Sequence, residues 1–124
     1  MKKIKIIVVD DREVFKKALR MYLLKFEDFE VIAEASDGLA FLDLLNHLDP
    51  DIVIMDIVMP HMDGIEATKK ALKKKPSLKI IALTTFEDLE YRESMMNAGA
   101  CAYLRKDSVN GKLENMIREF VKPE

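Results

Sequence analysis

The chain has 124 residues, a length typical of one domain, and 49% of them are hydrophobic. Its 20 lysines and arginines nearly balance 22 aspartates and glutamates, which excludes the strongly basic surface of a typical nucleic-acid-binding domain. The single cysteine excludes an internal disulfide, and no apolar run has the length of a membrane span or of a secretory signal. We therefore expect one cytoplasmic domain spanning residues 1–124, without membrane attachment.

Apolar runs predict five β-strands, at residues 4–9, 31–35, 52–55, 80–83 and 101–104. Several of these runs are continuously apolar, which is typical of strands buried on both faces of a sheet. Apolar residues at helical spacing lie between the strands, as in Phe15, Leu19 and Tyr22 after the first strand. Strict alternation of strands and helices with short connections predicts a parallel sheet with right-handed crossovers.

Local sequence also predicts where several helices begin and end. Asp63-Gly64-Ile65-Glu66 and Thr85-Phe86-Glu87-Asp88 have the pattern of capping boxes at helix starts. Ser108 can cap the last helix, and Gly99 suits the C-terminal turn of the fourth helix.

Polar and charged residues follow four of the predicted strands. Asp10 and Asp11 come directly after the first strand, Asp56 after the third, Thr84 after the fourth and Lys106 shortly after the fifth. In an open α/β sheet, ligands bind outside the carboxyl ends of the strands. We therefore expect three carboxylates, one hydroxyl and one ammonium group to converge at this edge of the sheet.

Such a convergence suits a hard cation and a phosphoryl group. Mutual repulsion raises the proton affinity of clustered carboxylates, and a divalent cation such as Mg²⁺ reverses this effect. A metal-held carboxylate can attack a phosphoryl group and form an aspartyl-phosphate. Lys106 and Thr84 could then stabilise charge on the transferred phosphoryl oxygens.

Five short motifs follow one another along the chain. They are Asp10-Asp11, Asp56 within the segment 55–64, Leu83-Thr84-Thr85-Phe86, Ala98-Gly99-Ala100 and Tyr103-Leu104-Arg105-Lys106. In this order and spacing the chain closely resembles a response-regulator receiver domain of two-component signalling, over essentially its whole length. The resemblance implies an α/β, flavodoxin-like (βα)5 doubly wound fold, with a five-stranded parallel sheet of strand order 2-1-3-4-5.

At one position the chain departs from the common receiver pattern, and this departure indicates a subfamily. Many receivers carry proline after the lysine, whereas this chain has Asp107 in Lys106-Asp107-Ser108. In this feature the chain resembles receivers of the NarL/LuxR-type subfamily. Members of that subfamily usually carry a C-terminal helix-turn-helix domain. The resemblance therefore implies transcriptional output through a DNA-binding domain that this chain lacks, with no direct nucleic-acid binding by the chain itself. The alternative is a stand-alone receiver that acts by protein–protein contact.

The resemblance also implies how the metal and the phosphoryl group are bound. Asp56 would be the phosphoacceptor. Asp11 and Asp56 would bind Mg²⁺ (or Mn²⁺) directly, together with the backbone carbonyl of Val58, and Asp10 would act through a metal-bound water. The implied phosphodonor is a phosphohistidine on a sensor histidine kinase or a phosphotransfer protein.

Other implied roles concern switching and the lifetime of the phosphoryl group. Thr84 would hydrogen-bond the phosphoryl group, Lys106 would pair with it, and Tyr103 would be an aromatic switch that turns inward when Thr84 moves. Val58 and Phe86 would flank the approach of a hydrolytic water. Both side chains are apolar and cannot orient that water, so we expect a long-lived phosphoryl group and slow autodephosphorylation. A phosphorylation-dependent homodimer is a further expectation.

Other interpretations are open for these residues. The Asp10-Asp11 pair could be a helix N-cap, Tyr103 could be an ordinary strand aromatic, and Phe86 could fold back against the sheet. An aspartate-nucleophile phosphohydrolase typically places two aspartates one residue apart after its first strand, whereas here they are adjacent. A flavin or nucleotide binder needs glycines or hydroxyls around its phosphate, whereas Asp10-Asp11-Arg12-Glu13 repels one.

Overall fold

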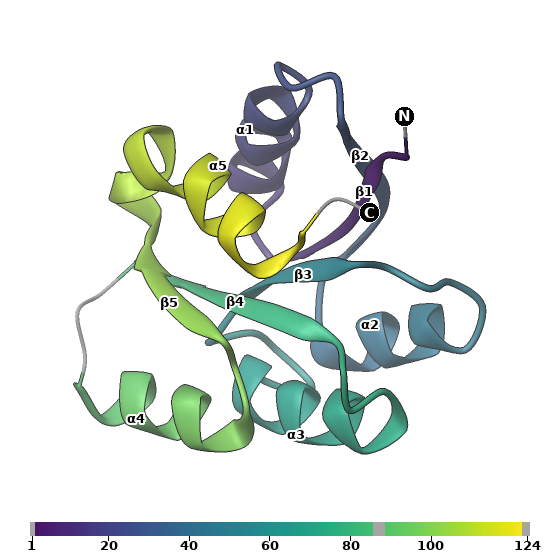
Figure 1. The fold of residues 1–124 in the computed structure, drawn as a ribbon. Coiled ribbons are helices and arrows are strands. Elements are labelled where there is room, and N and C mark those ends of the chain that lie inside the picture. The colour runs from purple at the N-terminus through teal and green to yellow at the C-terminus, as the bar shows by residue number, and fades with distance from the viewer. Residues whose placement is uncertain (1, 86–88, 123–124) are drawn as a thin grey trace.

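A computed structural model describes residues 2–85 and 89–122 of the chain (Figure 1). The strands are β1 (Ile4–Val9), β2 (Phe29–Ala35), β3 (Ile52–Asp56), β4 (Lys79–Thr84) and β5 (Ala102–Arg105). The helices are α1 (Glu13–Leu23), α2 (Gly38–Leu45), α3 (Gly64–Lys74), α4 (Leu89–Ala98) and α5 (Val109–Phe120), with a 3-10 turn η1 (Lys106–Ser108) before α5. All strand pairs are parallel in the order β2-β1-β3-β4-β5, which confirms the predicted fold class.

The sheet separates two hydrophobic layers. Helices α1 and α5 cover one face, and α2, α3 and α4 cover the other (Figure 1). Alternate residues of β1 enter opposite layers: Ile6 and Val8 pack with the α1 and α5 side, whereas Ile7 and Val9 pack with the other side. This double burial explains the continuously apolar strands. Full burial of one such side chain contributes roughly 1.5–3 kcal/mol, so the central strands fix the frame of the molecule.

Several strands are longer than the sequence predicts. Strand β2 begins at Phe29, where Ile4 of β1 is its partner, and β3 and β4 include Asp56 and Thr84 as their last residues. Pairing with neighbouring strands extends each strand beyond its apolar run. Asp56 and Thr84 are therefore fixed by the sheet itself rather than by a loop.

Helix boundaries agree with the sequence at some ends and not at others. Asp63 caps α3, because its Oδ1 accepts the Glu66 N–H at 2.9 Å. Gly99 has φ +115° and its N–H donates to the Met96 carbonyl, as expected at the C-terminus of α4. The prediction for Ser108 is wrong: it holds the N-cap position of α5, but its hydroxyl makes no capping bond because η1 leads directly into the helix. The predicted capping box of residues 85–88 falls largely outside the described residues.

No helix within the described ranges is both long enough and apolar enough to cross a lipid bilayer.

Close packing of Gly64 ties the start of α3 to the end of β3. A Cβ atom on Gly64 would lie 2.2 Å from the Asp56 carbonyl oxygen and 3.0 Å from the Ile57 Cα. The Gly64 N–H also donates to the Ile57 carbonyl at 2.6 Å. Both neighbours are backbone atoms that cannot rotate away. The position of Asp56 at the sheet edge therefore depends on a side chain being absent here.

Gly64→Ala should lower the free energy of unfolding by roughly 1–3 kcal/mol, because the added methyl group overlaps the β3 backbone. Gly111→Ala is the matched control, since a Cβ at Gly111 meets nothing within 4 Å. That change should raise stability by up to about 1 kcal/mol through helix propensity. Urea unfolding followed by circular dichroism measures both. Equal effects of the two substitutions would show that the approach at Gly64 is not a constraint.

Candidate functional site

Three acidic residues meet at the carboxyl ends of β1 and β3. Each of Asp10, Asp11 and Asp56 offers a carboxylate oxygen, and these oxygens lie within 4.8 Å of one another. Strands β1 and β3 are paired neighbours, with Val9 opposite Met55, and this pairing places the residues after β1 beside the end of β3. Asp10 is 2% exposed and Asp56 7% exposed, whereas Asp11 lies at the surface. The expected convergence of the three carboxylates is found.

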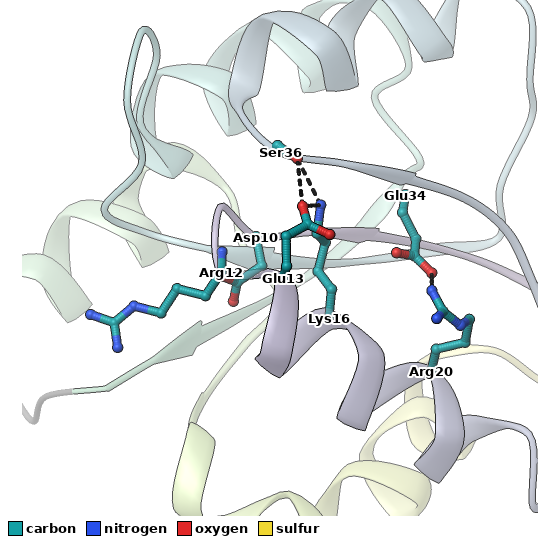
Figure 2. Close-up of polar contacts among 7 residues, drawn as sticks. All are labelled: Asp10, Arg12, Glu13, Lys16, Arg20, Glu34 and Ser36. Atoms are coloured by element: carbon teal, nitrogen blue, oxygen red, sulfur yellow. Dashed lines mark hydrogen bonds and ion pairs between the residues drawn. The ribbon is translucent and has the colours of Figure 1, made fainter.

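The carboxylate of Asp10 is held from two sides. Its Oδ1 accepts the Arg12 N–H at 2.8 Å, and its Oδ2 lies 2.6 Å from Lys106 Nζ. The backbone N–H of Asp10 donates to the Ala35 carbonyl. Helix α1 has Arg12 as its N-cap, and no side chain caps it, so neither aspartate serves as the helix cap. The bond from Asp10 to Arg12 instead closes a turn between β1 and α1 (Figure 2).

Lys106 enters the site from η1, just after β5. Its Nζ lies 2.6 Å from Asp10 Oδ2 and 3.6 Å from Asp56 Oδ2, and it sits 4.3 Å from the centre of the Phe15 ring. The side chain is only 10% exposed. Within the described part of the chain, no contact of Nζ has the angular geometry of a hydrogen bond. Charge and the aromatic face therefore hold the ammonium group, and aligned hydrogen bonds do not.

The surroundings of Asp56 disfavour its ionised form. Burial is the largest cause, followed by the charge of Asp10, and together they raise the pKa of Asp56 from 3.8 to about 6. Lys106 and the Ile57 N–H, which donates to Oδ1 at 2.9 Å, act in the opposite direction. Asp11 adds a smaller repulsion. Three carboxylates beside one ammonium group thus leave an excess of negative charge that a cation would relieve.

The donor set fits a hard divalent cation. Carboxylate oxygens are the ligands that Mg²⁺ and Mn²⁺ prefer, and the described residues bring no sulfur or imidazole ligand into this acidic cluster. The raised pKa of Asp56 follows from the same burial and the same neighbouring carboxylates, whose repulsion a cation would relieve.

A pocket of about 290 Å³ opens over Asp56. Its walls are Asp11, Arg12, Asp56, Val58, Thr84, Thr85 and Tyr91. Thr84 is buried at the end of β4, and Val58 is 58% exposed at the rim. The pocket therefore combines a buried carboxylate, a buried hydroxyl group and an exposed apolar side chain.

Sequence reasoning missed three of these lining residues, Arg12, Thr85 and Tyr91, and predicted Thr85 only as part of a capping box. Arg12 directly follows the aspartate pair, and that adjacency was a usable indication that it borders the same site. Tyr91 lies in the first turn of α4 and lines the pocket through tertiary packing, so no local pattern could identify it.

Other predicted site residues lie away from this pocket. Lys106 lines a different pocket of about 290 Å³ between α1 and α5, with Phe15, Tyr22 and Asn110 among its walls. Tyr103 lies on β5 opposite Ala82, partly buried against the α4 side of the sheet, and the Arg92 guanidinium sits 5.4 Å from its ring centre. Phe86 falls outside the described residues.

Sequence comparison shows to which family the chain belongs. Residues 6–118 match the response regulator receiver domain family. The transcriptional regulatory protein LiaR of Bacillus subtilis is 40% identical over 121 residues, covering 98% of this chain and 57% of that protein. The uncharacterized transcriptional regulatory protein YhcZ of the same organism is 43% identical over 104 residues, covering 84% and 49%. The chain therefore spans about half the length of these relatives.

Solved structures agree with this result. A two-component response regulator of the LuxR family from Aurantimonas sp. SI85-9A1 superposes with a TM-score of 0.89 at 28% identity, covering 95% of this chain and 84% of that chain. The signal receiver domain of the putative response regulator NarL from Mycobacterium tuberculosis shares the fold, with a TM-score of 0.90 at 24% identity and full coverage of both chains. The chain belongs to the response-regulator receiver domain family, among relatives of the NarL/LuxR type.

Proposed function

We propose that the domain is a phosphorylation-driven switch in which Asp56 accepts a phosphoryl group. The observation that carries this proposal is the position of Asp56: a buried carboxylate on the floor of an open pocket, beside two further carboxylates and 3.6 Å from an ammonium group. The donor would be a phosphohistidine of a sensor histidine kinase or a phosphotransfer protein.

Asp11 and Asp56, with the backbone carbonyl of Val58, would hold Mg²⁺ or Mn²⁺, and Asp10 would act through a water. When bound, the cation would neutralise the clustered carboxylates and the negative oxygens of the phosphoryl group. The surface position of Asp11 and the raised pKa of Asp56 support this arrangement. Asp10, already paired with Lys106 and the Arg12 N–H, is suited to the indirect role.

Phosphoryl transfer requires an oriented nucleophile. The Ile57 N–H fixes Oδ1 of Asp56 and so sets the plane of the carboxylate. As an Asp56 oxygen bonds to phosphorus, the phosphorus–nitrogen bond of the donor breaks, and its electron pair remains on the imidazole nitrogen. The Thr84 hydroxyl and the Lys106 ammonium group would then stabilise the negative phosphoryl oxygens.

The conformational response would pass through Thr84, Lys106 and Tyr103. Thr84 ends β4, and Tyr103 on the neighbouring β5 is paired with Ala82, two residues before Thr84. Lys106 links the loops after β3 and β5 by its proximity to Asp56. Contacts that form only with a phosphorylated Asp56 would shift this edge of the sheet between two states.

Val58 would act on the lifetime of the phosphoryl group. Its exposed apolar side chain at the pocket rim cannot orient a hydrolytic water, which supports slow autodephosphorylation. The matching role of Phe86 stays a prediction, because that residue is outside the described part of the chain. Self-phosphoryl transfer would be the only chemistry, without turnover of a separate substrate.

The proposed output is transcription in the cytoplasm, because the matched relatives are longer proteins described as transcriptional regulatory proteins. A stand-alone receiver that acts by protein contact is the alternative. Phosphorylation-dependent homodimerisation would use α4 rather than α5, because Ile117 is fully buried and Phe120 packs against the core, whereas Leu89 and Met96 are exposed on α4.

Asp56→Asn should abolish phosphorylation of the purified domain by acetyl phosphate in the presence of Mg²⁺, because the amide is not a nucleophile. Mass spectrometry should detect one hydroxylamine-sensitive phosphate on the wild-type protein and none on the variant. Asp43→Asn, an exposed aspartate on α2, is the control and should be labelled like wild type. A labelled Asp56→Asn protein would refute the assignment.

Asp56 should also make stability depend on pH when metal is removed with EDTA. The folded protein keeps a proton on Asp56 up to about pH 6, whereas the unfolded chain loses it near pH 3.8. The free energy of unfolding should therefore fall by ~1–2 kcal/mol as pH rises from about 4 to 6, after allowance for solvent screening. Because Asp56→Asn stays neutral, it should be more stable than wild type at pH 8 and equal to it at pH 4.

Thermal unfolding across this pH range, with Asp43→Asn as the control, measures the effect. Adding Mg²⁺ at pH 8 should stabilise wild type and should have a smaller effect on Asp56→Asn. If the stability of Asp56→Asn depended on pH in the same way as that of wild type, Asp56 would not be the carboxylate whose raised pKa causes the effect.

Lys106→Ala should leave Asp56 able to accept a phosphoryl group but should uncouple the conformational change. Amide chemical shifts of α4, with and without beryllofluoride as a phosphoryl mimic, measure the coupling. The exposed Lys112→Ala variant on α5 should respond like wild type. Unchanged shifts in wild type would exclude a switch at α4, and wild-type-like shifts in Lys106→Ala would exclude a role for that residue.

A further inference from the structure

The pocket over Asp56 has one positively charged wall. Of the described residues that line it, Arg12 alone is cationic. Lys106 Nζ lies 3.6 Å from Asp56 Oδ2, but its side chain lines the pocket between α1 and α5 and not this one. An anion entering the Asp56 pocket would therefore meet the Arg12 side chain before it meets Lys106.

The backbone of Arg12 is fixed by the site itself. Its N–H donates to Asp10 Oδ1 at 2.8 Å, and its carbonyl accepts the Lys16 N–H at 3.0 Å. The residue is the N-cap of α1, in extended backbone conformation, but its side chain makes no capping bond. A side chain anchored in this way can reach over the pocket without any cost to the start of the helix.

Two cations of α1, Lys16 and Arg20, have structural partners. Lys16 is buried and lies 2.8 Å from Glu13 Oε1 and 2.7 Å from Ser36 Oγ, and Arg20 pairs with Glu34. Figure 2 shows the Arg12 side chain extending away from this cluster. Its guanidinium group forms no ion pair with any acidic residue in the described ranges.

The net charge of the acidic cluster suggests what the Arg12 guanidinium group does. Asp10, Asp11 and Asp56 carry three negative charges against one on Lys106, so a divalent cation brings the cluster only to neutrality. An incoming phosphodonor is itself strongly anionic and gains little attraction from a neutral cluster. A guanidinium group at the pocket wall supplies a positive charge and paired N–H donors that match phosphoryl oxygens.

We propose that Arg12 is a donor-binding residue, whose guanidinium group engages the phosphoryl oxygens of the incoming donor and selects for strongly anionic donors. The inference rests on the proposed function of Asp56. With acetyl phosphate, an Asp56 oxygen bonds to phosphorus while the bond from phosphorus to the acetyl oxygen breaks, and acetate leaves with the electron pair. Arg12 contacts the phosphoryl oxygens throughout this step and exchanges no proton.

The test compares Arg12→Ala, Arg12→Lys and a matched control, Lys17→Ala. Lys17 is an exposed lysine of the same helix that lines neither of these two pockets, so its removal changes the net charge equally. Initial rates of Asp56 phosphorylation are measured with acetyl phosphate and with the less anionic phosphoramidate, in Mg²⁺, over a range of ionic strength. Mg²⁺ affinity is measured separately by calorimetry.

Arg12→Ala should lower the second-order rate constant of phosphorylation by acetyl phosphate about tenfold, as expected for loss of a charge-assisted contact, and should lower that for phosphoramidate less. Arg12→Lys should recover part of the loss, and the rate of Arg12→Ala should depend less on salt than that of wild type. Mg²⁺ affinity should be unchanged or higher, because a repelling cation has been removed.

Three results would overturn the inference. They are an Arg12→Ala rate within twofold of that of Lys17→Ala, equal losses with both donors, and a weakened Mg²⁺ affinity, which would assign Arg12 to holding the turn after β1. Each of these presupposes a wild-type protein that is phosphorylated at Asp56. Failure of wild type to become phosphorylated would instead overturn the proposed function, and this inference with it.

Discussion

Placing ionised carboxylates inside the edge of a sheet is the constraint on which the rest of this molecule depends. Asp10 is almost fully buried, and Asp56 is buried beside it. Among the described residues, the one ammonium group close to both is that of Lys106, and it lies nearer to Asp10 than to Asp56. Burial of such charge is costly unless it is compensated. Burial and the charge of Asp10 raise the pKa of Asp56, and a bound cation would relieve this repulsion.

A rigid frame is needed to keep these charges together. Central strands with both faces buried provide it, since Ile7 and Val9 pack on one side and Ile6 and Val8 on the other. The contact of Gly64 with the Asp56 backbone adds a second restraint, from α3. The free energy gained by burying two apolar layers thus offsets the repulsion among the carboxylates at one edge of the sheet. The stability of the fold and the charge of the site therefore depend on each other.

Much of this arrangement is predictable because local patterns in the sequence determine it. Continuous apolar runs predict buried parallel strands, and a charged residue at the end of such a run predicts its place at the sheet edge, as for Asp10 and Asp56. Features created by tertiary contact are not predictable in this way. Examples are the 3-10 turn that deprives Ser108 of a capping role, the arrival of Tyr91 beside the pocket and the approach of Lys106 from the α1 and α5 side.

Lys106 has one further consequence. Its side chain borders the pocket between α1 and α5, where it rests on the Phe15 ring, while its charge acts on Asp10 and Asp56 on the other side. A molecule that touches this lysine from the α1 and α5 side therefore perturbs the same ammonium group that lies 3.6 Å from Asp56 Oδ2. Thermodynamic linkage makes such an effect reciprocal: whatever Asp56 modification does to binding in that pocket, binding there does to the modification equilibrium by the same factor.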